Sequence, residues 1–190
     1  MYRTLLQDAR FYAFKLEADR TIVAEARKKV CVICGEVVHT SDFPRKPRGG
    51  PAALGEDANV RFSLCCAQLE CRTRLTPASL RFLGRKVYLG AVVVVVTAMR
   101  HGASPTRMKR LEELFGVSRR TVERWRAWWQ TTFTKTLCWR EAAASFVPAV
   151  ELAGLPASLL ARFRGGEEEQ LVLLLRLLAP LTGGVVVHAP

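Results

Sequence analysis

The sequence predicts a mainly α-helical protein with a small β zinc ribbon, a three-helix helix-turn-helix core and additional C-terminal helices. Three observations support this fold class: two cysteine pairs with metal-ligand spacing, apolar residues that recur at helical spacing, and a glycine turn between two amphipathic segments. We expect an N-terminal helix and zinc-ribbon module in residues 1–78, a helix-turn-helix DNA-binding domain in residues 79–135, and a helical extension with a flexible tail in residues 136–190.

The charge of the chain favours a nucleic-acid partner. The 190 residues include 29 Lys+Arg and 17 Asp+Glu, which gives a net charge of +12. Residues 141–190 hold three Arg and five Glu, so the positive excess lies in residues 1–140. Charge alone would fit RNA, acidic lipid or an acidic protein equally well, because phosphate attraction carries no sequence information. The helix-turn-helix pattern is what indicates double-stranded DNA.

The cysteines are better explained by metal binding than by disulfides. The N-terminal segment lacks the regions of a secretory signal, and the apolar run of residues 91–98 is shorter than the roughly 20 residues of a membrane helix. We therefore expect a cytoplasmic protein with no membrane partner. In that reducing compartment, six cysteines are not expected to form a disulfide framework.

Residues 4–29 form the first predicted helix. Leu5, Tyr12, Leu16 and Val23 lie near one side of it, and charged residues occupy the other. We expect this helix to pack on the zinc module.

Four cysteines have the spacing of a structural zinc site. Cys31 and Cys34 form a CxxC pair followed directly by a glycine, and Cys66 and Cys71 supply a second pair. Four thiolates bind Zn²⁺ tetrahedrally and leave no open position for an activated water. We therefore expect a structural zinc ion as the cofactor.

The third ligand of this site has alternatives. Alternation in the strand predicted over residues 60–64 continues to place Cys66 on the apolar face, which favours Cys66. A site that uses Cys65 with Cys71 stays open, and His39 is a weaker rival ligand.

A basic loop over residues 45–51 separates the two cysteine pairs. Arg45, Lys46 and Arg48 in this loop are candidate DNA contacts.

Residues 83–100 are the predicted first helix of the three-helix core. The five valines of residues 92–96 would favour a buried strand if taken alone. We predict a helix because a helix-turn-helix needs a first helix and this segment is the one in the right place. It is expected to begin after Gly84 or Arg85 and to end at His101.

The second helix is predicted over residues 105–115, with Ser104 as N-cap and Pro105 at the favoured first position. Gly116 ends it because glycine readily adopts a left-handed conformation, and Ser118 caps the next helix. This arrangement is typical of the joint in a helix-turn-helix.

The next helix is the predicted recognition helix. Val122, Trp125 and Trp129 share an inward face, which leaves basic residues on the outward face. In such motifs the N-terminal residues of this helix meet base edges, arginine can bind guanine bidentately and glutamate can accept from cytosine. The candidate DNA contacts are Arg107, Ser118, Arg119, Arg120, Thr121, Glu123 and Arg124.

Beyond the motif, we expect a helical continuation over residues 136–144, an extended linker near Pro148, and a short helix that opens with residues 155–160 and ends near residues 165–166. Residues 167–179 form a leucine-rich helix with glutamates at its N-terminus. Its leucines surround the helix, so it is either the core of a helical pair or a surface for self-association or a second protein. Residues 183–190 are expected to be unstructured.

The order of these motifs resembles small bacterial proteins associated with insertion sequences and transposases. The resemblance covers roughly residues 5–165 and rests on the CxxC pair, the Pro-Arg-Lys-Pro-Arg-Gly-Gly-Pro loop, the Arg-Phe-Ser-Leu-Cys-Cys segment that leads to Cys71, residues 81–90 and the helix-turn-helix. It implies a protein similar to the DNA-binding front end of transposases, associated with the bacterial nucleoid.

We expect no enzymatic activity from this chain. DNA cleavage by two metal ions needs three converging carboxylates, and residues 76–140 supply only Glu112, Glu113 and Glu123. The sequence contains no GxSxG, Walker or HExxH motif.

Two functions remain. The first is a site-specific DNA-binding module, either an accessory factor of a mobile element or a transcriptional regulator. The second is an adaptor that docks a transposase or polymerase and binds nucleic acid without sequence preference. Loss of a base contact at Arg120 should weaken binding to a cognate site more than to random DNA only under the first function.

Overall fold

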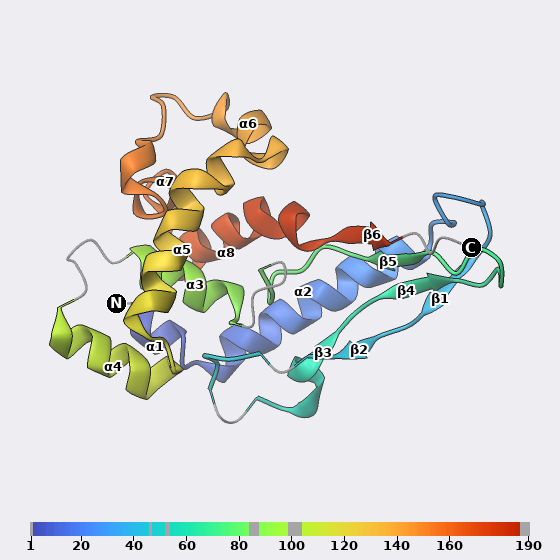
Figure 1. The fold of residues 1–190 in the computed structure, drawn as a ribbon, viewed down its shortest axis with the longest axis horizontal. Helices are drawn as coiled ribbons and strands as arrows, with labels where there is room; N and C mark the ends of the chain where they lie inside the picture. Colours follow the sequence, from blue (N-terminus) through green and yellow to red (C-terminus); the bar gives the residue numbers. More distant parts are fainter. Residues whose placement is uncertain (1, 46, 52–53, 84–87, 99–103, 187–190) are drawn as a thin grey trace.

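The computed structural model describes residues 2–45, 47–51, 54–83, 88–98 and 104–186. Figure 1 shows a helical part at one end and an antiparallel sheet towards the other, with the long helix α2 (Ala9–Arg27) running between them. The protein is therefore mainly helical with a small sheet, as the sequence predicted.

The predicted N-terminal helix is divided in two. α1 (Tyr2–Leu5) ends in a turn, and α2 begins after Asp8, whose carboxylate accepts a hydrogen bond from the backbone N–H of Arg10. A side-chain acceptor at the N-cap satisfies a free amide and so starts a new helix, which interrupts the single helix predicted over residues 4–29. α2 contacts β1 (Val38–Thr40) and thus packs on the cysteine-containing module as expected.

The larger sheet has the strand order β1-β4-β5-β6, and each neighbouring pair is antiparallel. Its other strands are β4 (Leu64–Cys66), β5 (Arg74–Thr76) and β6 (Gly184–Val186). A smaller ribbon pairs β2 (Phe43–Pro44) with β3 (Val60–Arg61), and the short 3₁₀ helix η1 (Glu56–Asn59) leads into β3.

β6 corrects the prediction that residues 183–190 are unstructured. Its residues pair with β5, with Val185 opposite Leu75. Gly183 lets the chain approach this strand, because a Cβ at that position would lie 3.1 Å from the carbonyl oxygen of Thr76. The partner strand is distant in sequence, so no local pattern predicted the pairing. Residues 187–190 lie outside the described part of the chain.

α3 (Gly90–Ala98) contains the five valines and is helical as predicted, but it begins later than the expected start after residue 84 or 85. Tyr88 and Leu89 instead form bridges to Arg48 and Phe82, which keeps the chain extended up to Gly90. α3 packs against α5 and α8, and burial on several sides outweighs the strand preference of valine. The predicted helix end at residue 101 lies outside the described residues.

α4 (Pro105–Phe115) matches its predicted extent, and α5 (Arg119–Thr131) begins directly after its predicted N-cap, Ser118. The two helices are joined by a three-residue turn, and the 3₁₀ helix η2 (Phe133–Lys135) then leads into α6 (Leu137–Ala143). The hydroxyl of Thr136 caps α6 by accepting a hydrogen bond from the backbone N–H of Trp139.

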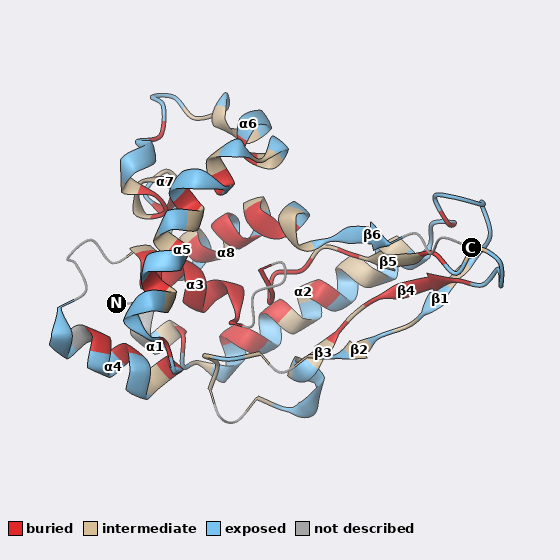
Figure 2. Cartoon of the chain, viewed as in Figure 1, coloured by how far each residue is buried: buried red, intermediate tan, exposed pale blue. Residues whose placement is uncertain are grey.

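The C-terminal helices belong to the same core as α3. η3 (Leu152–Gly154), α7 (Ala157–Leu160), α8 (Glu167–Leu178) and the 3₁₀ helix η4 (Ala179–Thr182) follow α6. α7 ends at Leu160, earlier than the predicted end near residues 165–166, because residues 161–166 form turns and bends. α8 contacts α1, α3 and α7, so its leucines pack on several neighbours at once. Figure 2 shows that the buried residues concentrate in α3 and α8 and continue into neighbouring helices. Among the described helices, none has both the length and the apolar character needed to cross a lipid bilayer.

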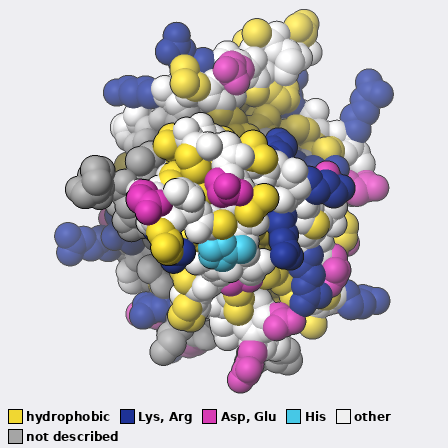
Figure 3. All heavy atoms as spheres, turned by 90° about the vertical axis from the view of Figure 1, so that its right-hand side faces the viewer, with side chains coloured by type: hydrophobic (Ala, Val, Ile, Leu, Met, Phe, Trp, Pro, Cys, Tyr) yellow, Lys and Arg dark blue, Asp and Glu magenta, His cyan; other side chains and the backbone are white. Residues whose placement is uncertain are grey.

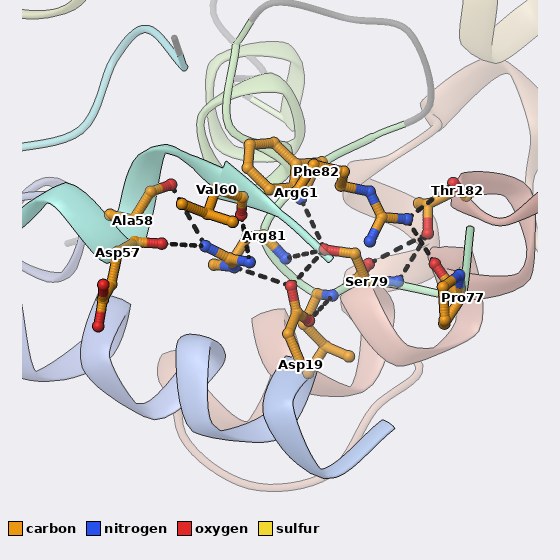
Figure 4. Close-up of polar contacts among 11 residues, drawn as sticks. Asp19, Asp57, Ala58, Val60, Arg61, Pro77, Ser79, Arg81, Phe82 and Thr182 are labelled. Carbon is orange, nitrogen blue, oxygen red and sulfur yellow. Dashed lines mark hydrogen bonds and ion pairs between the residues drawn. The ribbon is translucent and has the colours of Figure 1, made fainter. Parts of the chain in front are cut away.

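A buried polar network joins α2 to the segment before α3 (Figure 4). Asp19 accepts hydrogen bonds from Nε of Arg81 at 2.8 Å and from the backbone N–H of Leu80 at 2.6 Å. Arg81 also donates to the carbonyl oxygen of Val60 at 2.8 Å. Asp19 and Arg81 are only 1% and 2% exposed. Each buried charge is therefore stabilised by the other and by these backbone hydrogen bonds, and not by water.

Arg61 connects this network to the C-terminal part of the chain. It is buried and donates to the carbonyl oxygens of Pro77 and Thr182. The hydroxyl of Thr182 in turn accepts from the backbone N–H of Ser79 at 2.7 Å. Arg61, Ser79 and Arg81 thus connect the middle of the chain by hydrogen bonds to η4 as well as to α2.

Candidate metal centre and nucleic-acid interface

Four cysteines from two separate segments meet at the end of the sheet. The sulfur atoms of Cys31, Cys34, Cys66 and Cys71 all lie within 4.8 Å of one another. The Cys31 and Cys71 sulfurs are 3.8 Å apart, and those of Cys34 and Cys66 are 3.4 Å apart. The four predicted ligands therefore form one group that could hold a metal ion.

Tight turns and the sheet bring the sulfurs together. After the first pair, Gly35 has φ +76° and its N–H donates to the carbonyl of Cys31 at 2.9 Å. Cys66 lies in β4 opposite Val38 of β1, and its backbone N–H donates to the carbonyl of Thr73 at 2.9 Å. The pairing of β1 with β4 thus places the second pair beside the first.

In the absence of a cation, the thiols of this group differ strongly in pKa. Backbone N–H groups of Cys34 and Ile33 that face the Cys31 sulfur lower the pKa of that thiol to about 6. Burial instead raises the pKa of the Cys66 thiol to about 12. A cation at the centre would stabilise the thiolate form of every member, which is the usual state of a metal-bound cysteine.

The structure distinguishes the two candidates for the third ligand. Successive side chains of a strand point to opposite faces, so Cys66 reaches the cluster whereas Cys65 faces the other way. The Cys65 thiol lies 3.7 Å from the carbonyl oxygen of Arg72, and Cys65 is not among the four grouped sulfurs. His39 is exposed on β1 opposite Cys65 and is likewise outside the group.

The turn between α4 and α5 has the predicted local geometry. Gly116 has φ +63°, and its N–H donates to the carbonyl of Glu112 at 2.8 Å. The hydroxyl of Ser118 accepts a hydrogen bond from the backbone N–H of Thr121 at 3.4 Å, so it caps α5. The hydroxyls of Ser118 and Thr121 are 3.1 Å apart and hydrogen-bond to each other.

α5 has one buried and one exposed face. Val122, Trp125 and Trp129 are buried, and the indole N–H of Trp129 donates to the hydroxyl of Thr97 on α3 at 2.9 Å. The predicted DNA-contacting side chains on the first turns of α5 are exposed together: Arg119, Arg120, Glu123 and Arg124.

The described arginines of the basic loop differ in exposure, although the sequence suggested both as DNA contacts. Arg48 is exposed, whereas Arg45 is half-buried with its guanidinium 5.4 Å from the ring centre of Phe82. Burial also lowers the pKa of Arg45. Lys46 and the side chain of Arg107 lie outside the described part of the chain.

Sequence reasoning missed the contribution of Tyr88. Its hydroxyl donates to the carbonyl oxygen of Gly116 at 2.6 Å, and its ring meets the ring of Trp125 edge-on at 4.9 Å. A tyrosine just before a helix carries no pattern that would indicate these contacts in advance.

Comparisons with protein-family models, with curated proteins and with solved structures found no match to this chain.

Proposed function

We propose that this protein is a zinc-binding, helix-turn-helix protein that binds double-stranded DNA through the exposed face of α5. The observation that carries the proposal is the shared exposure of Arg119, Arg120, Glu123 and Arg124 next to a capped, glycine-terminated turn. The N-terminal residues of a recognition helix are the ones that reach base edges in the major groove.

The packing behind α5 supports this role. The buried tryptophans of α5 contact α3 and Tyr88, and Met108, Leu111 and Phe115 of α4 are buried in the same apolar cluster. A rigid support of this kind can hold the exposed arginines in one orientation against the groove. In the proposed complex, Arg120 contacts guanine, Glu123 accepts from cytosine, and neighbouring arginines hold phosphates.

The proposed metal is zinc. Four cysteine sulfurs in one group match the ligand set of structural zinc sites, and as thiolates they would fill a tetrahedral coordination sphere. In this proposal, Cys31, Cys34, Cys66 and Cys71 hold the ion, and it stabilises the adjoining turns and sheet.

The proposed biological context is that of a mobile element, in line with the resemblance of the sequence to transposase-associated proteins. The chain would recognise DNA as an accessory factor or a transposase-like module, and it would have no catalytic activity of its own. Metal-dependent strand cleavage by the purified protein would contradict this part of the proposal.

The direct test is selection of duplexes from a random pool by the purified, zinc-loaded protein at near-physiological salt. A defined motif in the selected duplexes would support sequence-specific recognition under one further condition. The Arg120→Ala variant must bind this motif much more weakly than the wild type does, while the affinity of the variant for random duplex changes little. Arg140→Ala is a matched control, because Arg140 is an exposed arginine on α6. Absence of any duplex binding would contradict the proposal.

An adaptor function is favoured by a different observation. Apolar side chains are exposed around the cysteine group, with Val32 69%, Ile33 57% and Leu69 77% exposed. Figure 3 looks onto this end of the molecule, where hydrophobic side chains reach the surface among charged ones. A surface of this composition suits contact with another protein, such as a transposase or polymerase.

The adaptor function makes its own prediction. Ile33→Asp would abolish binding to such a partner without changing duplex affinity, and Arg120→Ala would weaken binding to cognate and random duplexes by the same factor. Unequal loss between the two duplexes would favour the first function instead.

A further inference from the structure

Arg48 and Gly49 of the basic loop lie against the start of α3 and the residues before it. Arg48 forms a parallel bridge with Tyr88, and its carbonyl oxygen accepts from the N–H of Leu89 at 3.1 Å. Gly49 has φ +86°, and a Cβ there would lie 3.0 Å from Cγ2 of Val92. Only glycine suits such a close approach in this conformation. The position of Arg48 and Gly49 is therefore determined by contacts with the helical core.

The same residue that holds the loop also holds the turn before α5. Tyr88 bridges Arg48 through its backbone, while its hydroxyl donates to the carbonyl oxygen of Gly116 at 2.6 Å. Gly116 lies two residues before the N-cap of α5. Tyr88 thus connects the loop to the N-terminal end of α5, which is the end that approaches base edges in the proposed complex.

The exposed charges of the two segments have the same sign. Arg48 is exposed on the loop, and Arg119, Arg120 and Arg124 are exposed on α5. Arg45 differs, because its guanidinium lies against the ring of Phe82. Of the described loop arginines, Arg48 is the one suited to contact an anion in solution.

We propose that Arg48 and the N-terminal end of α5 form one continuous DNA-binding surface, with Tyr88 as its positioning residue. Arg48 neutralises a backbone phosphate beside the groove that α5 occupies, so the loop widens the footprint of the recognition helix. This inference rests on the proposed DNA-binding function. It adds that the segment between the cysteine pairs and the α4–α5 motif act on the same duplex.

The salt dependence of duplex binding tests the phosphate contact. Affinities for a duplex of about 30 base pairs would be measured over a salt series for the wild type, Arg48→Ala and the control Arg140→Ala. Each phosphate contact contributes about 0.9 to the slope of log affinity against log salt concentration. We expect Arg48→Ala to reduce the slope by about that amount and Arg140→Ala to leave it unchanged. An Arg48→Ala slope equal to that of the wild type would overturn the proposal.

A double-mutant cycle tests the positioning role of Tyr88. Tyr88→Phe removes the hydrogen bond to Gly116 but retains a ring that can pack on Trp125. We expect it to weaken binding in the wild type and to have little further effect in the Arg48→Ala background. Equal weakening in both backgrounds would mean that the Tyr88 hydroxyl acts independently of Arg48, and it would overturn the role of Tyr88 in coupling the loop to α5. If the wild type itself binds no duplex, the proposed function fails together with this inference, whereas wild-type binding with unaltered variants contradicts the inference alone.

Discussion

Lys15 has an environment that is rare for a lysine. Its side chain is fully buried on α2, and Nζ lies 4.1 Å from the ring centre of Phe11 and 3.9 Å from that of Tyr12. Among the described residues, Nζ has no hydrogen-bond partner. Burial lowers the pKa of Lys15 from 10.5 to about 7, with the nearby Asp19 opposing the shift and Arg81 adding to it.

Lys15→Met should stabilise the protein at pH 7 by about 2–5 kcal/mol, since one pKa unit corresponds to about 1.4 kcal/mol. Between the folded pKa of about 7 and the unfolded value of 10.5, the unfolded chain holds a proton that the folded chain has lost. The unfolding free energy of the wild type therefore rises with pH in this window, and its difference from the variant narrows. Urea unfolding at several pH values measures this difference.

Lys135→Met is the control for that experiment, because Lys135 is exposed on η2. It should change the unfolding free energy little at any pH. A stability difference between the wild type and Lys15→Met that stays constant from pH 7 to pH 10 would show that the pKa of Lys15 is not lowered.

Neighbouring cysteines provide a second test at the level of single residues. Cys66→Ser should weaken metal binding by more than about 100-fold, because the Cys66 sulfur belongs to the four-sulfur group. Loss of an outer-shell partner of a metal ligand typically weakens metal binding by about 10- to 100-fold, so loss of a ligand itself should exceed that range. Cys65→Ser should leave the affinity nearly unchanged, because Cys65 faces away from that group. Competition with a chromophoric zinc chelator measures both. Equal losses in the two variants would contradict the assignment of Cys66.

At the level of elements, sequence signals such as caps, glycines and residue spacing predicted the features that local interactions determine. The end of α4 followed from the glycine at Gly116, and the start of α5 followed from the helix cap at Ser118. The four sulfurs also followed from spacing and strand alternation. Local signals predicted neither β6 nor the buried pair of Asp19 and Arg81, because each depends on a partner far away in sequence. A charged residue on a helix is ordinarily predicted to be exposed, and no pattern near Asp19 indicated otherwise.

The α4–α5 turn makes a prediction about its own element. Gly116→Ala should lower the unfolding free energy by about 1–2 kcal/mol, the cost of a left-handed conformation for a residue with a Cβ. Gly116 has φ +63° and open space around it, so the cost is conformational and not steric. Gly55→Ala is the matched control, since Gly55 has equal space but φ −60°. Similar effects of the two substitutions in urea unfolding would contradict this explanation.

At the level of the whole molecule, the two ends are stabilised by different means. The helical end has a continuous apolar core, whereas the end with the cysteine group exposes apolar side chains and has few buried ones nearby. Arg48 and Gly49 of the basic loop belong to the helical end, because they contact α3 and the residues before it. Metal binding should therefore matter most for the far end of the sheet.

Metal removal tests this division. With a chelator present, amides of residues 31–40 and 64–76 should lose protection from hydrogen exchange, while amides of α3, α5 and α8 should remain protected. Hydrogen–deuterium exchange followed by mass spectrometry measures both groups. A simultaneous loss of protection in the helices would show that the metal group and the helical core unfold as one unit.

The pairing of β6 with β5 has a consequence for synthesis on the ribosome. Ser79 and Thr182, which hydrogen-bond to each other, are 103 residues apart. The nascent chain therefore emerges with β5 unpaired on one edge and with Arg61 lacking one of its carbonyl partners. An exposed strand edge invites pairing with other chains. Until η4 and β6 have left the exit tunnel, this edge of the sheet stays open to pairing with strands of other chains.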